Sequence, residues 1–130
     1  MKKKIPLIGL LSALLCIGLL SGPALAQSSV HIHFFVVPSQ PAAGVNYWDA
    51  MEALRAKLVE LAGGYTELGP SNGGSEGSGG TINKEYNFSF LASAPRDITS
   101  DLEEFIPKYF DISLPFILHW TGDCSFPASR

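Results

Sequence analysis

The chain contains little cysteine, and no cluster of positive charge follows its first few residues. Cys16 falls within a predicted leader, so the mature chain keeps only Cys124 and has no internal disulfide. Cys124 is therefore predicted to be a free thiol or to bridge to a second copy. After the leader, the chain contains six scattered Lys and Arg residues and twelve Asp and Glu residues, which gives a net charge of 6 − 12 = −6. This balance argues against binding to nucleic acid or to anionic lipid.

No motif of a common catalytic or cofactor site occurs in the structural context that its chemistry needs. The glycine-rich stretch 69–80 does not follow a strand and open a helix, which argues against a phosphate-binding loop. Gly73-Gly74-Ser75-Glu76-Gly77 matches the letters of a G-x-S-x-G nucleophile motif, but it lies in a predicted flexible loop and not on a turn from a strand into a helix, which argues against a serine nucleophile. The paired acids Asp101, Glu103 and Glu104 fit the first turn of a helix, where the helix dipole stabilises them. No catalytic or cofactor-binding residue is predicted. The sequence therefore favours a non-enzymatic protein over an enzyme.

The first 26 residues have the pattern of a secretory signal peptide. Three lysines precede an apolar run over 5–20, and Ala24-Leu25-Ala26 supplies a small-residue cleavage site. The run of about 16 apolar residues is shorter than the roughly 20 of a membrane-spanning helix. Cys16 has no small residue directly before it, as a lipid-attachment site would. We therefore predict cleavage after Ala26 and a secreted or periplasmic protein without stable membrane anchoring.

The mature chain begins with a strand that is apolar on more than one side. β-Branched and aromatic residues over 30–37 end at Pro38. One face of this strand is wholly apolar and carries Val30, Ile32, Phe34 and Val36. The other face carries His31, His33, Phe35 and Val37. Because both faces contain apolar residues, the strand is predicted to lie in the centre of a sheet.

A helix over 47–62 is the strongest local prediction. Apolar residues recur at steps of four and three, at Tyr47, Met51, Leu54, Leu58 and Leu61. Asn46 is predicted to cap its start, and Gly63-Gly64 to end it.

The remaining elements are shorter. We predict strands over 65–68, 85–92 and 116–121, a flexible hairpin loop over 69–80 and a tail over 122–130. A second helix is predicted to begin at Thr99 or Ser100, with a capping box formed by Ser100 and Glu103. Pro107 predicts a kink or break near Ile106.

The order strand, helix, strand, strand, helix, strand predicts a single α+β domain over 27–121. We expect the ferredoxin-like βαββαβ arrangement, a four-stranded antiparallel sheet with two helices on one face. The helices are predicted to cover Val30, Ile32, Phe34, Val36, Tyr86, Phe88, Phe90, Phe116, Leu118 and Trp120. All three histidines would then lie on the open face with Thr121.

The segment Gly63-Gly64-Tyr65-Thr66 ends the first helix and precedes a glycine-rich hairpin. A strand containing Glu85-Tyr86-Asn87-Phe88 and a short helix follow. This layout over residues 30–120 resembles a group of small bacterial α/β proteins of unknown function, some of which have leaders. The resemblance implies the fold and supplies no activity or site residues.

Two functional hypotheses follow from the predicted open face. The first is a non-enzymatic module that binds a partner, or forms a homodimer, through Phe35, Val37, Asn87, Ser89, Leu91 and Ile117. The alternative is a metal-binding protein or small metal-dependent enzyme. His31 and His33 would be about 6.6 Å apart along one strand, and His119 on a neighbouring strand would complete a zinc or copper site.

Overall fold

The computed structural model describes residues 27–125. The predicted leader, residues 1–26, and residues 126–130 lie outside the described part of the chain. The residues Ser28–Cys124 form one compact unit. Within the described residues, no helix is long and apolar enough to cross a membrane.

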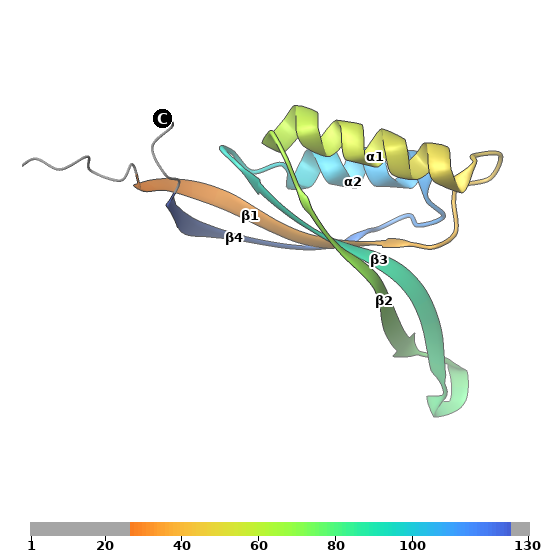
Figure 1. The fold of residues 1–130 in the computed structure, drawn as a ribbon. Helices are drawn as coiled ribbons and strands as arrows, with labels where there is room; N and C mark the ends of the chain where they lie inside the picture. The colour runs from red at the N-terminus through yellow and green to blue at the C-terminus, as the bar shows by residue number, and fades with distance from the viewer. Residues whose placement is uncertain (1–26, 126–130) are drawn as a thin grey trace, which may run out of the picture. The chain divides into compact units, whose positions relative to one another are not determined.

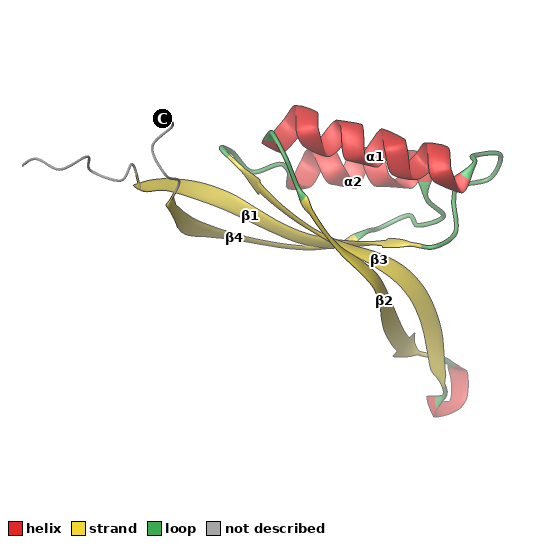
Figure 2. Ribbon diagram, in the orientation of Figure 1, coloured by secondary structure: helices red, strands yellow, loops and turns green. Residues whose placement is uncertain are grey.

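Four strands and two helices follow one another in the predicted order. They are β1 (Gln27–Pro38), α1 (Tyr47–Ala62), β2 (Thr66–Glu76), β3 (Ile82–Ala94), α2 (Thr99–Tyr109) and β4 (Phe116–Ser125), with a short 3₁₀ turn at Ser78–Gly80. The strands form one antiparallel sheet in the order β2-β3-β1-β4. Both helices lie on the same side of the sheet (Figures 1 and 2). The predicted α+β class, with two helices and a four-stranded antiparallel sheet, is confirmed.

Helix α1 has the predicted bounds, and its ends are closed by the predicted residues. The Asn46 side chain accepts hydrogen bonds from the backbone N–H groups of Trp48 and Asp49, at 2.9 and 3.4 Å. Gly63 follows the helix with φ of 75°, in the left-handed region that favours glycine. The buried stripe of the helix is Ala50, Met51, Leu54 and Leu58.

The core lies between the helices and one face of the sheet. On the sheet side it is built on Phe35 and Val37 of β1 and Phe90 of β3, all fully buried. The rings of Phe35 and Phe90 stack with centroids 5.4 Å apart. The helices contribute Met51, Leu54, Leu58, Leu102 and Ile106 to the same cluster.

The predicted faces of β1 and β4 are reversed. Phe35 and Val37 are buried under the helices, whereas Phe116, Leu118 and Trp120 are 55%, 48% and 44% exposed. The reason is the register between strands. β3 was predicted correctly to turn Phe88 and Phe90 towards the helices, and β1 places Phe35 opposite Phe90 and Val37 opposite Phe88. Paired residues share a face, so the helix side of β3 determines the helix side of β1.

The glycine-rich stretch is mostly strand, not the flexible loop that was predicted. β2 continues from Thr66 to Glu76 and pairs with β3 along its length, ending with Glu76 opposite Ile82. A bulge between Glu67 and Gly69 shifts the register, and Gly69 has φ of 93° there. The backbone hydrogen bonds of an antiparallel ladder need no side chain, so glycine can occupy it. The far end of this hairpin extends beyond the helices (Figure 1).

The second half of the chain departs from the prediction at three points. α2 continues past Pro107 to Tyr109, so the predicted break near Ile106 is wrong. Asp97, rather than a box of Ser100 and Glu103, accepts the hydrogen bond from the first turn, donated by the backbone N–H of Thr99. β4 runs to Ser125, so residues 122–125 belong to the strand and not to a tail.

Candidate functional site

The structure brings the three histidines together at one end of the sheet. His31 and His33 are alternate residues of β1, and His119 lies on the adjacent strand β4. Nδ1 of His31 and Nε2 of His119 are 2.9 Å apart. The ring of His119 stacks on both other rings, with centroids 5.1 Å from His31 and 4.7 Å from His33. The cluster lies on the helix side of the sheet, so the prediction that the histidines occupy the open face is wrong.

Asp97, in the loop between β3 and α2, completes the cluster. Its Oδ1 accepts hydrogen bonds from the backbone N–H and the hydroxyl of Thr99, at 2.9 and 2.6 Å. Oδ1 lies 3.0 Å from His33 Nε2, and Oδ2 lies 3.5 Å from His119 Nδ1. The two bonds from Thr99 hold the pKa of the Asp97 carboxyl well below its ordinary range. The group is therefore a carboxylate at any ordinary pH.

Asp97 was missed in the sequence, although a local signal was present. An Asp two residues before a Thr at the start of a helix is a common capping arrangement. Its approach to the histidines depends on the path of the loop from β3 to α2, which the sequence does not give.

Nε2 of His33 lies near both a hydrogen-bond donor and a hydrogen-bond acceptor. The backbone N–H of Ile98 lies 3.2 Å from Nε2 and needs its lone pair, whereas the Asp97 carboxylate at 3.0 Å needs an N–H. One ring nitrogen cannot meet both demands. The other nitrogen, Nδ1, is buried and has no hydrogen-bond partner among residues 27–125. His33 is fully buried, so its hydrogen bonds are incomplete in either neutral tautomer.

The imidazole nitrogens and the carboxylate oxygens of this cluster are atoms of the kind that bind cations. One ligand atom each from His33, Asp97 and His119 lie within 4.8 Å of one another. His33 is buried, while the side chains of His119 and Asp97 are 28% and 49% exposed, so the cluster opens to solvent on one side.

The second candidate surface is the open face of the sheet. Alternation places seven large apolar side chains on it, opposite the core residues. They are Ile32, Phe34 and Val36 of β1, Leu91 of β3, and Phe116, Leu118 and Trp120 of β4. Phe34 and Phe116 make an edge-to-face contact with centroids 6.5 Å apart.

Only part of the predicted binding face lies on this surface. Asn87, Ser89 and Leu91 are on the open side, where the Ser89 hydroxyl donates to the hydroxyl of Ser71 at 2.7 Å. Phe35 and Val37 belong to the core, and Ile117 packs against it. The prediction that Phe35, Val37 and Ile117 lie on the open face is therefore wrong. The apolar surface that β1 presents there is formed instead by Ile32, Phe34 and Val36, which were predicted to lie under the helices.

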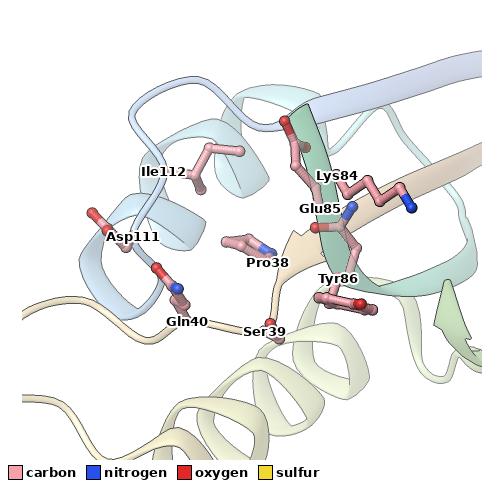
Figure 3. Close-up of a pocket in the computed structure, with 9 residues that line it drawn as sticks. Pro38, Ser39, Gln40, Lys84, Glu85, Tyr86, Asp111 and Ile112 are labelled. Carbon is pink, nitrogen blue, oxygen red and sulfur yellow. The ribbon is translucent and has the colours of Figure 1, made fainter. Parts of the chain in front are cut away.

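A separate cavity lies at the other end of β1, where Pro38 meets the base of the hairpin (Figure 3). It has a volume of about 370 Å³ and is lined by both signs of charge, including Lys84, Glu85 and Asp111. The ring of Tyr86 lies beside it (Figure 3). This mixed lining favours no particular class of ligand.

Comparison with known proteins adds no assignment. No family model, curated protein or solved structure matches the chain. The resemblance built on Gly63-Gly64-Tyr65-Thr66 therefore stays a prediction.

Proposed function

We propose that this protein is a small secreted or periplasmic module of ferredoxin-like fold whose open sheet face binds a second copy of the chain. The observation that carries the proposal is the uncovered apolar surface formed by β1, β3 and β4. The strand order supports the fold: β3 separates the two strands joined through α1, and β1 separates the two joined through α2. In each strand–helix–strand unit, the two strands are thus separated in the sheet by one strand of the other unit.

The size of the open face fits a homodimer. Strands spaced about 4.8 Å apart, with a rise of about 3.3 Å per residue, give β1, β3 and β4, at about ten residues each, a flat area of roughly 500 Å². Two such faces together remove roughly 1,000 Å² from water, the lower bound for a specific interface. The patch is also as large as the largest apolar patches of ordinary monomers, which are often functional.

The character of the face favours a copy of itself as the partner. A two-fold interface brings the same residues together from both chains, so a charged face would repel itself. The residues that β1 and β4 place on this face carry no charge: they are Val30, Ile32, Phe34 and Val36 of β1 and Phe116, Leu118, Trp120, Gly122 and Cys124 of β4. Both Phe116 and Trp120 are exposed here and are of types enriched at interfaces, and Trp is among the residues that contribute most of the binding energy there. Of the acids in β3 and β4, Glu85 shares the open side but lies beyond the end of β1, which pairs with β3 only as far as Asn87, and Asp123 alternates to the other side.

Size-exclusion chromatography with light scattering tests the proposal. The wild-type protein should be a dimer, and Leu118→Lys should be a monomer with an unchanged circular dichroism spectrum. Lysine at this position places a charge in the apolar contact, where its desolvation is costly. Trp48→Lys is the matched control, because Trp48 is 69% exposed on α1 and away from the open face. It should leave the dimer intact.

A monomeric wild-type protein would overturn the proposal. The same conclusion would follow if Leu118→Lys were as dimeric as the wild type, or if Trp48→Lys disrupted the dimer equally.

A further inference from the structure

We propose that His33, Asp97 and His119 bind a divalent first-row transition metal ion of the zinc class, with His31 orienting His119. The ligand set would use Nε2 of His33, a carboxylate oxygen of Asp97 and Nδ1 of His119. Two imidazoles and one carboxylate are a donor set that suits zinc and related ions, whereas calcium and magnesium prefer oxygen alone.

The distances between the ligand atoms support this assignment. Bonds of about 2.0–2.1 Å from a tetrahedral ion place neighbouring ligand atoms about 3.3 Å apart. His33 Nε2 lies 3.0 Å from Oδ1 of Asp97 and His119 Nδ1 lies 3.5 Å from the other oxygen, Oδ2, while the ligand atoms, one from each of the three residues, all lie within 4.8 Å of one another. The second distance is long for a hydrogen bond but suitable for two ligands of one ion. The rings of His33 and His119 stack with their planes 16° apart, so the exposed His119 ring and the Asp97 carboxylate must rotate on binding to bring all three atoms to the same centre.

The conflict at His33 is a second, independent observation. When Nε2 presents its lone pair, that lone pair and the Asp97 carboxylate are two acceptors 3.0 Å apart with no proton between them. A cation bound by both groups turns this repulsion into an attraction. The ion takes the lone pair that the N–H of Ile98 otherwise approaches at 3.2 Å, so this contact should lengthen on binding.

His31 fits the role of a positioning residue. If His119 binds through Nδ1, its proton resides on Nε2, which lies 2.9 Å from Nδ1 of His31. His119 can then donate this hydrogen bond to His31, which fixes its tautomer and ring orientation. Ligating histidines commonly make such an outer hydrogen bond, and its loss typically weakens metal binding 10- to 100-fold.

The three ligands come from segments that are distant in the sequence: β1, the loop before α2, and β4. The buried ligand His33 is held by the core, while the exposed sides of Asp97 and His119 leave a further coordination position open to water. The site lies on the opposite side of the sheet from the apolar face. Its occupancy is therefore a separate question from dimer formation.

Calorimetric titration of the purified, untagged protein with Zn²⁺ tests the proposal, and Co²⁺ absorption reports the coordination geometry. We expect one ion per chain in the wild type. His119→Gln and Asp97→Asn should each weaken binding more than about 100-fold, since loss of a ligand exceeds the loss of an outer hydrogen bond. Asp97→Asn keeps an oxygen that can accept from the N–H of Thr99, so the start of α2 is preserved. His33 is left unchanged because its side chain is in the core.

Two further variants make the result specific. His31→Gln should weaken Zn²⁺ binding by about 10- to 100-fold without changing the stoichiometry or the Co²⁺ spectrum. Asp123→Asn removes an exposed acid from the same strand as His119 and should leave binding unchanged. The proposal is overturned if the wild type shows no saturable binding. It is also overturned if His119→Gln and Asp97→Asn, both folded by circular dichroism, bind Zn²⁺ like the wild type.

Discussion

Phe34 and Phe35 are adjacent residues of β1 that point to opposite faces of the sheet, so the pair tests which face is the core. Phe35 is fully buried and stacks on Phe90 at 5.4 Å. Phe34 is only partly buried and contacts Phe116 at 6.5 Å. Replacing a buried Phe by Ala costs about 3–5 kcal/mol, from lost transfer energy and the cavity that remains. Phe34→Ala loses part of one side chain's burial and one aromatic pair, about 1 kcal/mol.

Urea unfolding followed by circular dichroism measures both free energies, in the Leu118→Lys background that is expected to be monomeric, because Phe34 also lies on the proposed dimer face. A loss of 3–5 kcal/mol is a large fraction of the roughly 5–15 kcal/mol that stabilises a typical domain, so Phe35→Ala is expected to be largely unfolded. Phe35→Leu keeps most of the volume and should cost about 1–1.5 kcal/mol, which gives a folded variant for comparison. If Phe34→Ala lowered the free energy of unfolding as much as Phe35→Ala, the assignment of faces would be refuted.

Two other predictions concern stability at single sites. Asn46→Ala should lower the free energy of unfolding by about 1 kcal/mol, because the N–H groups of Trp48 and Asp49 lose their acceptor; an unchanged urea midpoint would refute this. Arg96, bound to Asp101 at 2.7 Å, holds the pKa of the Asp101 carboxyl below its ordinary value. The folded pKa is thus below the unfolded one, so this stabilisation is present above about pH 4 and is lost as the pH falls further. Asp101→Asn should therefore be less stable than the wild type at neutral pH, with the difference shrinking in acid; a difference independent of pH would contradict this origin.

Local sequence signals were sufficient for α1 because everything that defines it lies within about twenty residues. The apolar spacing, the Asn46 cap and the glycine at position 63 are all local features, and the structure has the predicted bounds. The order of elements followed from the same kind of signal. The faces of β1 did not, because both are apolar and the choice depends on pairing with β3, more than fifty residues away.

The candidate sites show the same division between local and long-range information. Alternation along β1 put His31 and His33 on one face, but which face, and the arrival of Asp97 beside them, depend on tertiary structure. Glycine-rich composition favours flexibility in an isolated segment. Pairing of residues 69–76 with β3 overrides that tendency, because the backbone ladder does not depend on side chains.

The most direct test of the open-face proposal uses the two tryptophans of the chain. Trp120 lies on the open face, and Trp48 lies on α1, away from it. In protein labelled with fluorotryptophan, the ¹⁹F resonance of Trp120 should shift as dilution dissociates the dimer, while that of Trp48 stays fixed. A Trp48→Phe variant assigns the two signals. If the Trp120 resonance did not change across a concentration range in which light scattering records a change in mass, the copies would associate through another surface and the account would be contradicted.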